Sequence, residues 1–179
     1  MKYKHIMIDI ETMGNISYSS ILSIAAVKFD IETGDIGEKF HVNITFKSCL
    51  DAGLIVNADT ILWWMDRNSK ARKAIISPTN PVSLVTALLS FNGFCSKEYF
   101  IWGNSPRFDL GLIQNAYNKL DLPIPWDFRK ERDVRTLVGF APEIKNNHVM
   151  VGVAHNPIDD CLNQISYCTK TYNTIFNEE

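Results

Sequence analysis

Short apolar runs near the start of the chain predict a buried strand. In residues 5–10 the three isoleucines occupy alternate positions and share one face, while Met7 lies on the other. Apolar side chains on both faces are typical of a strand in the middle of a sheet. Two more strands are expected over residues 21–29 and 39–46, and Glu-Thr-Gly-Asp at residues 32–35 predicts the turn between them.

The rest of the chain shows the wider spacing of amphipathic helices, interrupted by two short strands. Apolar residues recur three and four positions apart in the helical stretches, and Asn-Pro pairs mark the beginning of two of them. We expect helices over residues 59–75, 81–94, 109–120, 133–140 and from 157 onward, and strands over residues 99–102 and 126–128. This order of strands and helices predicts an α/β fold with a mixed sheet.

Composition narrows the class of protein. The chain has 179 residues, 46% hydrophobic and 21% charged, which is typical of a globular protein and excludes disordered, collagen-like and coiled-coil chains. This length suits one core, so we expect a single domain over residues 1–179. No apolar run reaches the roughly 20 residues that cross a bilayer, so we expect no membrane contact. Four widely spaced cysteines without a targeting segment indicate reduced thiols and a cytoplasmic location.

Several acidic residues occupy positions that suggest chemistry. Asp9 and Glu11 are two residues apart on a predicted strand, so their carboxylates project to the same face and repel unless a cation lies between them. Asp109 begins a predicted helix directly after a strand, and Asp160 lies in the first turn of the last helix, near His155. Each also has a structural interpretation, because acids are common in turns and at helix beginnings.

Three motifs together resemble those of the DEDDh exonucleases, the DnaQ-like branch of the ribonuclease H-like superfamily. The motifs are Asp9-Ile-Glu11-Thr12, the segment Asn104 to Asp109 with Phe108 directly before the acid, and His155-Asn-Pro-Ile-Asp-Asp160. They occur in the family's order between about residue 5 and residue 168, and the chain is most similar to small stand-alone phage-type and bacterial members. The resemblance implies a ribonuclease H-like mixed β-sheet flanked by helices.

The resemblance also implies a metal-dependent 3′–5′ exonuclease that hydrolyses phosphodiester bonds from the 3′ end of RNA or single-stranded DNA. Two divalent cations, Mg²⁺ or Mn²⁺, are the implied cofactors, and carboxylate oxygens suit these hard ions. The implied metal-binding residues are Asp9, Glu11, Asp109 and Asp160. His155 is the implied general base and completes the catalytic set. In this pattern Asp9 bridges the two ions, Glu11 and Asp160 bind the first, and Asp109 contacts the second.

The implied substrate-binding residues are Thr12, Met13, Asn104 and Phe108. Met13 stands where many relatives have threonine, and Ser23 where many have glutamate, which leaves the choice between RNA and DNA open. Trp63 and Trp64 resemble a paired-tryptophan helix of the family. Adjacent side chains on a helix point in different directions, so at least one tryptophan is expected in the core or a subunit interface, and a homodimer is an open alternative to a monomer.

The net charge gives no general attraction for nucleic acid. The chain has 18 basic and 20 acidic residues, a net charge of −2, so phosphates need a local basic patch or bound cations. The basic clusters are Lys70, Arg72 and Lys73, and then Arg129, Lys130, Arg132 and Arg135. Each is either a solvated surface or a phosphate contact, and we favour the second cluster because it precedes the last motif.

Two other functions compete with the exonuclease. One is a non-catalytic nucleic-acid-binding or regulatory domain of the same fold, and the presence of all four acids and His155 disfavours it. The other is an endonuclease of the ribonuclease H type, which shares the acidic strand but does not require the motif that contains His155.

Overall fold

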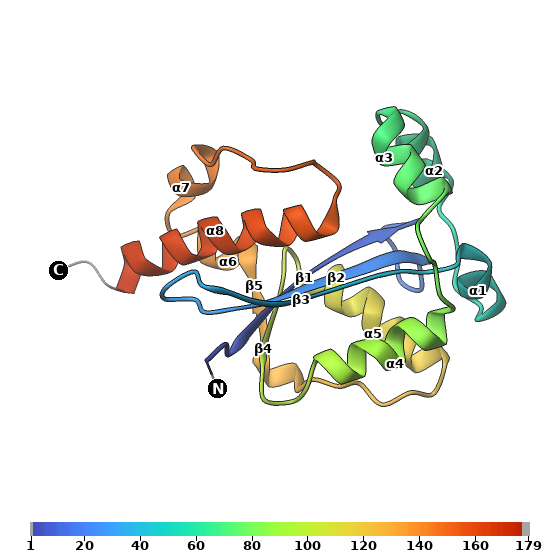
Figure 1. Cartoon of the computed structure of the whole chain (residues 1–179), viewed down its shortest axis with the longest axis horizontal. Coiled ribbons are helices and arrows are strands. Elements are labelled where there is room, and N and C mark those ends of the chain that lie inside the picture. The colour runs from blue at the N-terminus through green and yellow to red at the C-terminus, as the bar shows by residue number, and fades with distance from the viewer. Residues whose placement is uncertain (1, 177–179) are drawn as a thin grey trace.

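The computed structural model describes residues 2–176, which fold around one five-stranded mixed sheet (Figure 1). The strands are β1 (His5–Thr12), β2 (Ile21–Phe29), β3 (Ile36–Asn43), β4 (Phe100–Gly103) and β5 (Glu131–Asp133). Their order in the sheet is β3-β2-β1-β4-β5; β1, β2 and β3 pair antiparallel, and β4 and β5 continue parallel to β1. The expected mixed α/β fold is therefore confirmed.

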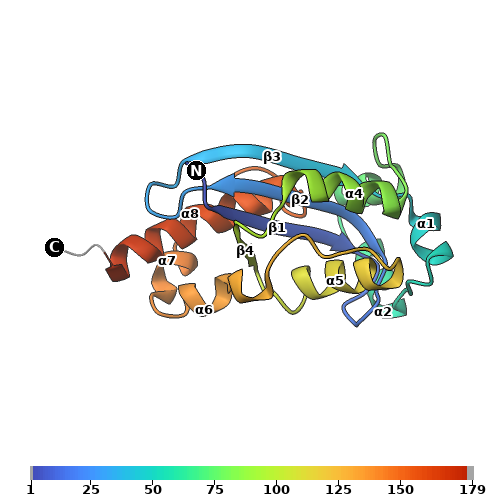
Figure 2. The ribbon, with the colours of Figure 1, turned by 90° about the horizontal axis from the view of Figure 1, so that it is seen from below.

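Helices cover both faces of this sheet. They are α1 (Phe46–Asp51), α2 (Ala58–Met65), α3 (Ser69–Ile76), α4 (Leu84–Phe94), α5 (Asp109–Lys119), α6 (Val134–Val138), α7 (Pro142–Asn146) and α8 (Pro157–Phe176). Figures 1 and 2 show α4 and α5 across one face and α8 across the other, with α6 and α7 beside α8. Helices α2 and α3 stand on the α8 side, beyond its N-terminal end. Within the described residues, no helix combines the length and apolar character needed to cross a membrane.

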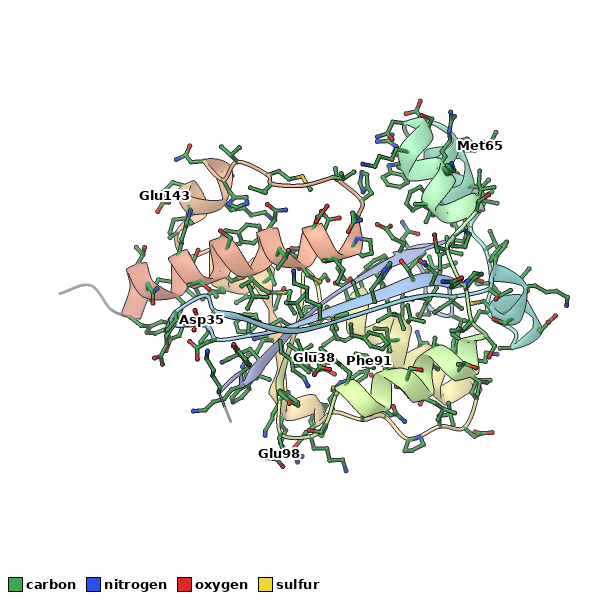
Figure 3. All side chains as sticks on the ribbon, viewed as in Figure 1. Asp35, Glu38, Met65, Phe91, Glu98 and Glu143 are labelled. Carbon is green, nitrogen blue, oxygen red and sulfur yellow. The ribbon has the colours of Figure 1, made fainter. Side chains whose placement is uncertain are left out.

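The alternation along β1 decides which side chains face α8. The isoleucines of β1 pack with α4 and α5, where Phe91 lies between helix and sheet (Figure 3). Met7 is fully buried on the opposite face, against Cys161 and Ile165 of α8. Because side chains alternate along a strand, Asp9 and Glu11 continue the Met7 face. The two acids are therefore directed toward α8.

Some predicted helix boundaries are wrong, and local capping explains the differences. Two helices replace the single one expected over residues 59–75, because the Asn68 side chain caps the beginning of α3. The helix expected from residue 81 begins at Leu84, because Ser83 provides the N-cap.

Strand boundaries differ as well. The elements expected at residues 39–46, 126–128 and 133–140 correspond to β3, β5 and α6 in shifted positions, and α1 and α7 have no counterpart in the prediction. Residues 46–51 leave the sheet as α1, and a 3-10 turn at Phe128–Lys130 precedes the last strand. Short elements of this kind carry too few periodic positions to be located from sequence.

We expect Tyr117→Phe to lower the free energy of unfolding by about 1 kcal/mol, the usual contribution of a buried hydrogen bond. The Tyr117 hydroxyl donates to the Leu88 carbonyl oxygen at 2.9 Å and so joins α5 to α4. Urea unfolding measures the change. Tyr172→Phe, near the C-terminal end of α8, serves as the control with a change below about 0.5 kcal/mol. Equal losses in the two variants would contradict a specific α4–α5 link.

Candidate active site

The first part of the site is the pair of carboxylates at the carboxyl end of β1. Glu11 is 9% exposed, and the pairing of β1 with β2 is irregular between Glu11 and Thr12. Burial raises the pKa of Glu11 from its ordinary value of 4.5 to about 8, with the charges of Asp160 and Asp109 adding to the shift. Burial also raises the pKa of Asp9 well above its usual range, and the charges of Asp109, Glu11 and Asp160 add to this rise.

Gln164, a residue of α8, forms a hydrogen bond with the Asp9 carboxylate. The Gln164 Nε2 atom donates to Asp9 Oδ1 at 2.9 Å, and this bond opposes part of the rise in the Asp9 pKa. Gln164 is 4% exposed, and its Oε1 atom is buried without a hydrogen-bond partner among the described residues. Sequence analysis missed Gln164. The available signal was its spacing, four residues after Asp160 and hence on the same helix face.

Asp109 reaches the site from the first position of α5. Its side chain is 3% exposed, and burial raises its pKa to about 7, although the backbone N–H groups of Asn104 and Asp109 itself oppose the shift. Gly103, at the end of β4, makes room for this carboxylate. A Cβ atom at position 103 would lie 3.0 Å from Asp109 Oδ2. The close approach of strand and helix therefore depends on glycine here.

His155, Glu11 and Asp160 meet in one cluster. One ligand atom from each lies within 4.8 Å of the other two, a spacing that permits a shared cation. Burial raises the pKa of Asp160, while the His155 charge and backbone N–H act in the opposite direction. His155 has a φ of 62°, in the left-handed region that non-glycine residues rarely adopt. Such a conformation persists where the surroundings fix it.

The loop before α8 fixes His155 through two side chains of that helix. Asp159 Oδ2 accepts a hydrogen bond from the Val153 N–H at 2.9 Å. The Asn163 side chain accepts from the Val151 N–H at 2.9 Å and donates to the Val151 carbonyl oxygen at 2.8 Å. The loop is thus fastened to α8 directly before the histidine. Neither side chain was assigned a role at the site from the sequence.

Two clefts flank Glu11, and each includes it in its lining. We call the first, of about 390 Å³, the aromatic cleft, because its lining includes Thr12, Trp63, Trp64 and Phe108. We call the second, of about 340 Å³, the lysine cleft, because its lining includes Lys70, Lys73, His41, Asn43 and His155. Glu11 is common to both linings, and His155 of the same candidate cation cluster lines the lysine cleft.

One of the paired tryptophans lies in the core and the other at the surface. A position in the core was one of the two expected for at least one of them. Trp64 is 5% exposed and donates from Nε1 to the Thr12 carbonyl oxygen at 2.9 Å. Trp63 is 40% exposed, and its ring meets the edge of His155 at a centroid distance of 5.2 Å. The pair therefore joins α2 to the first motif and places one indole next to the histidine.

The expected substrate-binding residues do not all gather at one place. Thr12 and Phe108 line the aromatic cleft, whereas Met13 and Asn104 are not among its lining residues. Asn104 has a buried Oδ1 atom without a partner within residues 2–176. The Met13 main chain bonds Ser20, which ties the turn after β1 to the beginning of β2.

The two basic clusters lie in different regions. Lys70 and Lys73 line the lysine cleft, next to the acids. Lys130 and Arg132 instead lie over the ring of Phe100, which pairs with the beginning of β1, at the end of the sheet away from Glu11. The first cluster therefore places two lysines at the site, and the second contributes Arg135, whose charge opposes the rise in the Asp109 pKa.

The donor set fits hard divalent cations. Within residues 2–176, no ion pair joins a lysine or arginine to Asp9, Glu11, Asp109 or Asp160. Four carboxylates with raised pKa values, none of them in an ion pair with a described lysine or arginine, lose their mutual repulsion when a cation binds between them. Oxygen donors of this kind match Mg²⁺ and Mn²⁺, whereas a zinc site would more often include cysteine or several histidines. The four cysteines are buried free thiols.

Comparison with known proteins gives a consistent result. The family model described as a 3′-5′ exoribonuclease Rv2179c-like domain matches residues 4–172. An exodeoxyribonuclease of Enterobacteria phage T4 is 24% identical in an alignment of 194 positions that covers 89% of this chain and 85% of the phage protein.

Solved structures share the fold at low sequence identity. The nuclease domain of 3′hExo, a DEDDh family member bound to rAMP, has a TM-score of 0.67 at 12% identity, with 96% of this chain and 93% of that chain covered. E. coli Exonuclease I in complex with a dT13 oligonucleotide has a TM-score of 0.70 at 15% identity. The match covers 97% of this chain but only 42% of the Exonuclease I chain. These likenesses confirm the ribonuclease H-like fold.

We expect Glu11→Gln to stabilise the chelated protein at pH 8 and to have little effect near pH 4.5. A carboxyl whose pKa rises on folding contributes stability that is intact below its unfolded pKa and is lost as the pH approaches its folded value, about 8 for Glu11. The glutamine side chain does not ionise, so the variant does not lose this stability as the pH rises. The expected gain in melting temperature in EDTA at pH 8 is about 5–10 °C.

The matched control is Glu143→Gln, an exposed acid on α7 at the periphery of the molecule (Figure 3). Calorimetry at both pH values, with and without Mn²⁺, measures the four melting temperatures. A chelated Glu11→Gln variant no more stable than the parent at pH 8 would show that the buried acid is not under electrostatic strain.

Proposed function

The chain belongs to the Rv2179c-like family of 3′-5′ exoribonuclease domains, and from this premise we propose that residues 1–179 act as one exonuclease domain that removes nucleotides from the 3′ end of single-stranded nucleic acid. The observation that carries the proposal is the position of the acidic cluster. Glu11 lines both clefts, so a strand that spans them passes its phosphodiester bond over the cluster.

We infer that Asp9, Glu11 and Asp160 hold one divalent cation and that Asp9 and Asp109 hold a second. Two such ions, Mg²⁺ or Mn²⁺, would supply a nucleophile at neutral pH and would offset charge on the attacking and leaving oxygens. The support lies in the raised pKa values of the four carboxyls, each of which favours a bound cation over an unpaired charge. Gln164 keeps the Asp9 carboxylate in one orientation.

We assign His155 the role of general base. Its imidazole lies within reach of Glu11 and Asp160 and lines the lysine cleft, where water enters beside the acids. A histidine there accepts a proton from the attacking water while the carboxylates remain available as ligands. The contact with Trp63 and the fastened loop restrict the ring to this position.

The aromatic cleft suits the terminal nucleotide. The exposed ring of Trp63 and the side chain of Phe108 offer stacking surfaces for a base, which contribute about 1–3 kcal/mol each in single-strand binding proteins. Thr12, directly after Glu11, lines the same cleft. We keep Met13 and Asn104 in the proposed substrate-binding set, with the unpartnered Asn104 Oδ1 as an acceptor. The family model favours RNA, and the phage relative is named for DNA.

The proposal includes a reducing, cytoplasmic setting and a homodimer. Four free, buried cysteines support the first. Exposed apolar side chains on α2, Leu62 and Met65 among them, support a subunit contact. Light scattering measures the mass in solution.

We expect a 5′-labelled single strand to be shortened stepwise from its 3′ end in Mg²⁺ or Mn²⁺ and to stay intact in EDTA. A blunt duplex should be degraded more slowly, because its terminal base must leave the stack before it enters the aromatic cleft. Matched RNA and DNA strands, run side by side, measure the substrate class. Internal cuts would indicate an endonuclease, and binding without cleavage would indicate a non-catalytic domain.

We expect His155→Ala to reduce the rate by roughly 10²–10⁴, the scale of general base catalysis, with little change in Mn²⁺ affinity. The variant should also lose the acid limb of the parent's pH–rate profile. Asp160→Asn is the comparison, because a lost ligand should weaken both metal affinity and rate. Mn²⁺ titrations and pH profiles of the three proteins separate the roles. Weakened Mn²⁺ binding in His155→Ala would make the histidine a ligand instead.

A further inference from the structure

The lysine cleft is a built feature of the fold. Asn43, at the end of β3, donates from its side chain to the Thr79 carbonyl oxygen at 3.0 Å, and the Val82 N–H donates to the Asn43 carbonyl oxygen at 2.9 Å. These bonds fasten the segment between α3 and α4 along the edge of the sheet. Helix α3 is thereby held beside the site, and the cleft of about 340 Å³ lies between it and the sheet.

The charge in this cleft is positive and unpaired. Lys70 and Lys73 are three residues apart on α3, so their side chains share one face. Both are exposed, and no ion pair with either is formed within the described residues. Arg72 of the same helix points elsewhere, because its Nη1 atom donates to the Met65 carbonyl oxygen at 2.8 Å. Two ammonium groups in one cleft attract an anion.

Neutral side chains line the cleft beside the lysines. Ser23, opposite Glu11 in the pairing of β1 with β2, and Asn43 are both among the lining residues. Burial lowers the pKa of His41, which therefore adds no charge near neutral pH. Apart from Glu11, the residues that line the cleft include no acid, so an anion that enters it meets repulsion at one end only.

We propose that the lysine cleft binds the phosphates of the strand upstream of the scissile bond, with Lys70 and Lys73 as their contacts. The inference rests on the proposed function, which places the terminal nucleotide in the aromatic cleft and the scissile phosphate at Glu11 and His155. The remaining strand must leave on the other side of the cluster, where the lysines lie. Contacts to phosphates are independent of sequence, so the cleft sets affinity and direction but not base preference.

A pair of substrates tests this division. The p-nitrophenyl ester of thymidine 5′-monophosphate has a scissile bond and a nucleoside but no upstream strand, whereas a labelled ten-residue oligonucleotide has both. For Lys70→Gln/Lys73→Gln we expect the KM of the oligonucleotide to rise about tenfold with kcat unchanged. Both constants for the ester should stay at the parent value. The slope of log KM against log salt concentration should fall by about 1.4, or 0.7 for each lost single-strand contact.

Arg72→Gln is the control on the same helix but outside the cleft, and it removes one positive charge where the double variant removes two. It should leave the salt slope and both KM values near those of the parent. An unchanged oligonucleotide KM in the double variant, or an equal rise for the ester, would overturn the proposal.

Failure of the proposed function gives a different result, since the parent would then hydrolyse neither substrate. Fluorescence anisotropy with the labelled oligonucleotide still tests the cleft in that case. Weaker binding by the double variant than by Arg72→Gln supports the phosphate site, and equal affinities of parent and double variant overturn it.

Discussion

The repulsion among buried carboxylates is the constraint on which the arrangement around the site depends. Asp9, Glu11, Asp109 and Asp160 come from three distant parts of the chain, and burial raises the pKa of each. A fold can keep such a group only if protons or cations offset its charge. Within the described residues no lysine or arginine forms an ion pair with them, which favours cations. Buried carboxylates that repel one another in this way are thus suited to bind cations.

Packing elsewhere holds the acids together against this repulsion. Strand β1 lies between β2 and β4, with its isoleucines in one core and Met7 in the other, so its path is fixed on both faces. Helix α8 then closes over the acidic end of the strand. It contributes Asp160, a hydrogen bond from Gln164 to Asp9, and the two side chains, Asp159 and Asn163, that fasten the loop of His155. A single helix therefore positions the carboxylates and His155 relative to each other.

The sequence predicts which residues form the acidic cluster better than it predicts which residues surround that cluster. The two-residue period of a strand is enough to place Asp9 and Glu11 on one face, and motif order is enough to add His155 and Asp160. Gln164 was not predicted as a site residue, because it lies on a face of α8 that the sequence pattern assigns to the apolar core. The second basic cluster is divided: the charge of Arg135 lowers the pKa of Asp109, whereas Lys130 and Arg132 lie over the Phe100 ring. Nearness in sequence to the last motif does not predict this division, because it says nothing about distance in space.

The break between α2 and α3 shows why a wrong boundary matters for function. In one continuous helix over residues 59–75, Trp63 and Lys70 would be seven positions, or two turns, apart and would share a face. The chain instead leaves the helix after Met65 and starts a new one at Asn68. Trp63 then lines the aromatic cleft and Lys70 the lysine cleft, on either side of the cluster that contains His155. An apolar surface and a cationic surface are thereby separated across the acids, and under the proposed function this polarity gives a bound strand its direction.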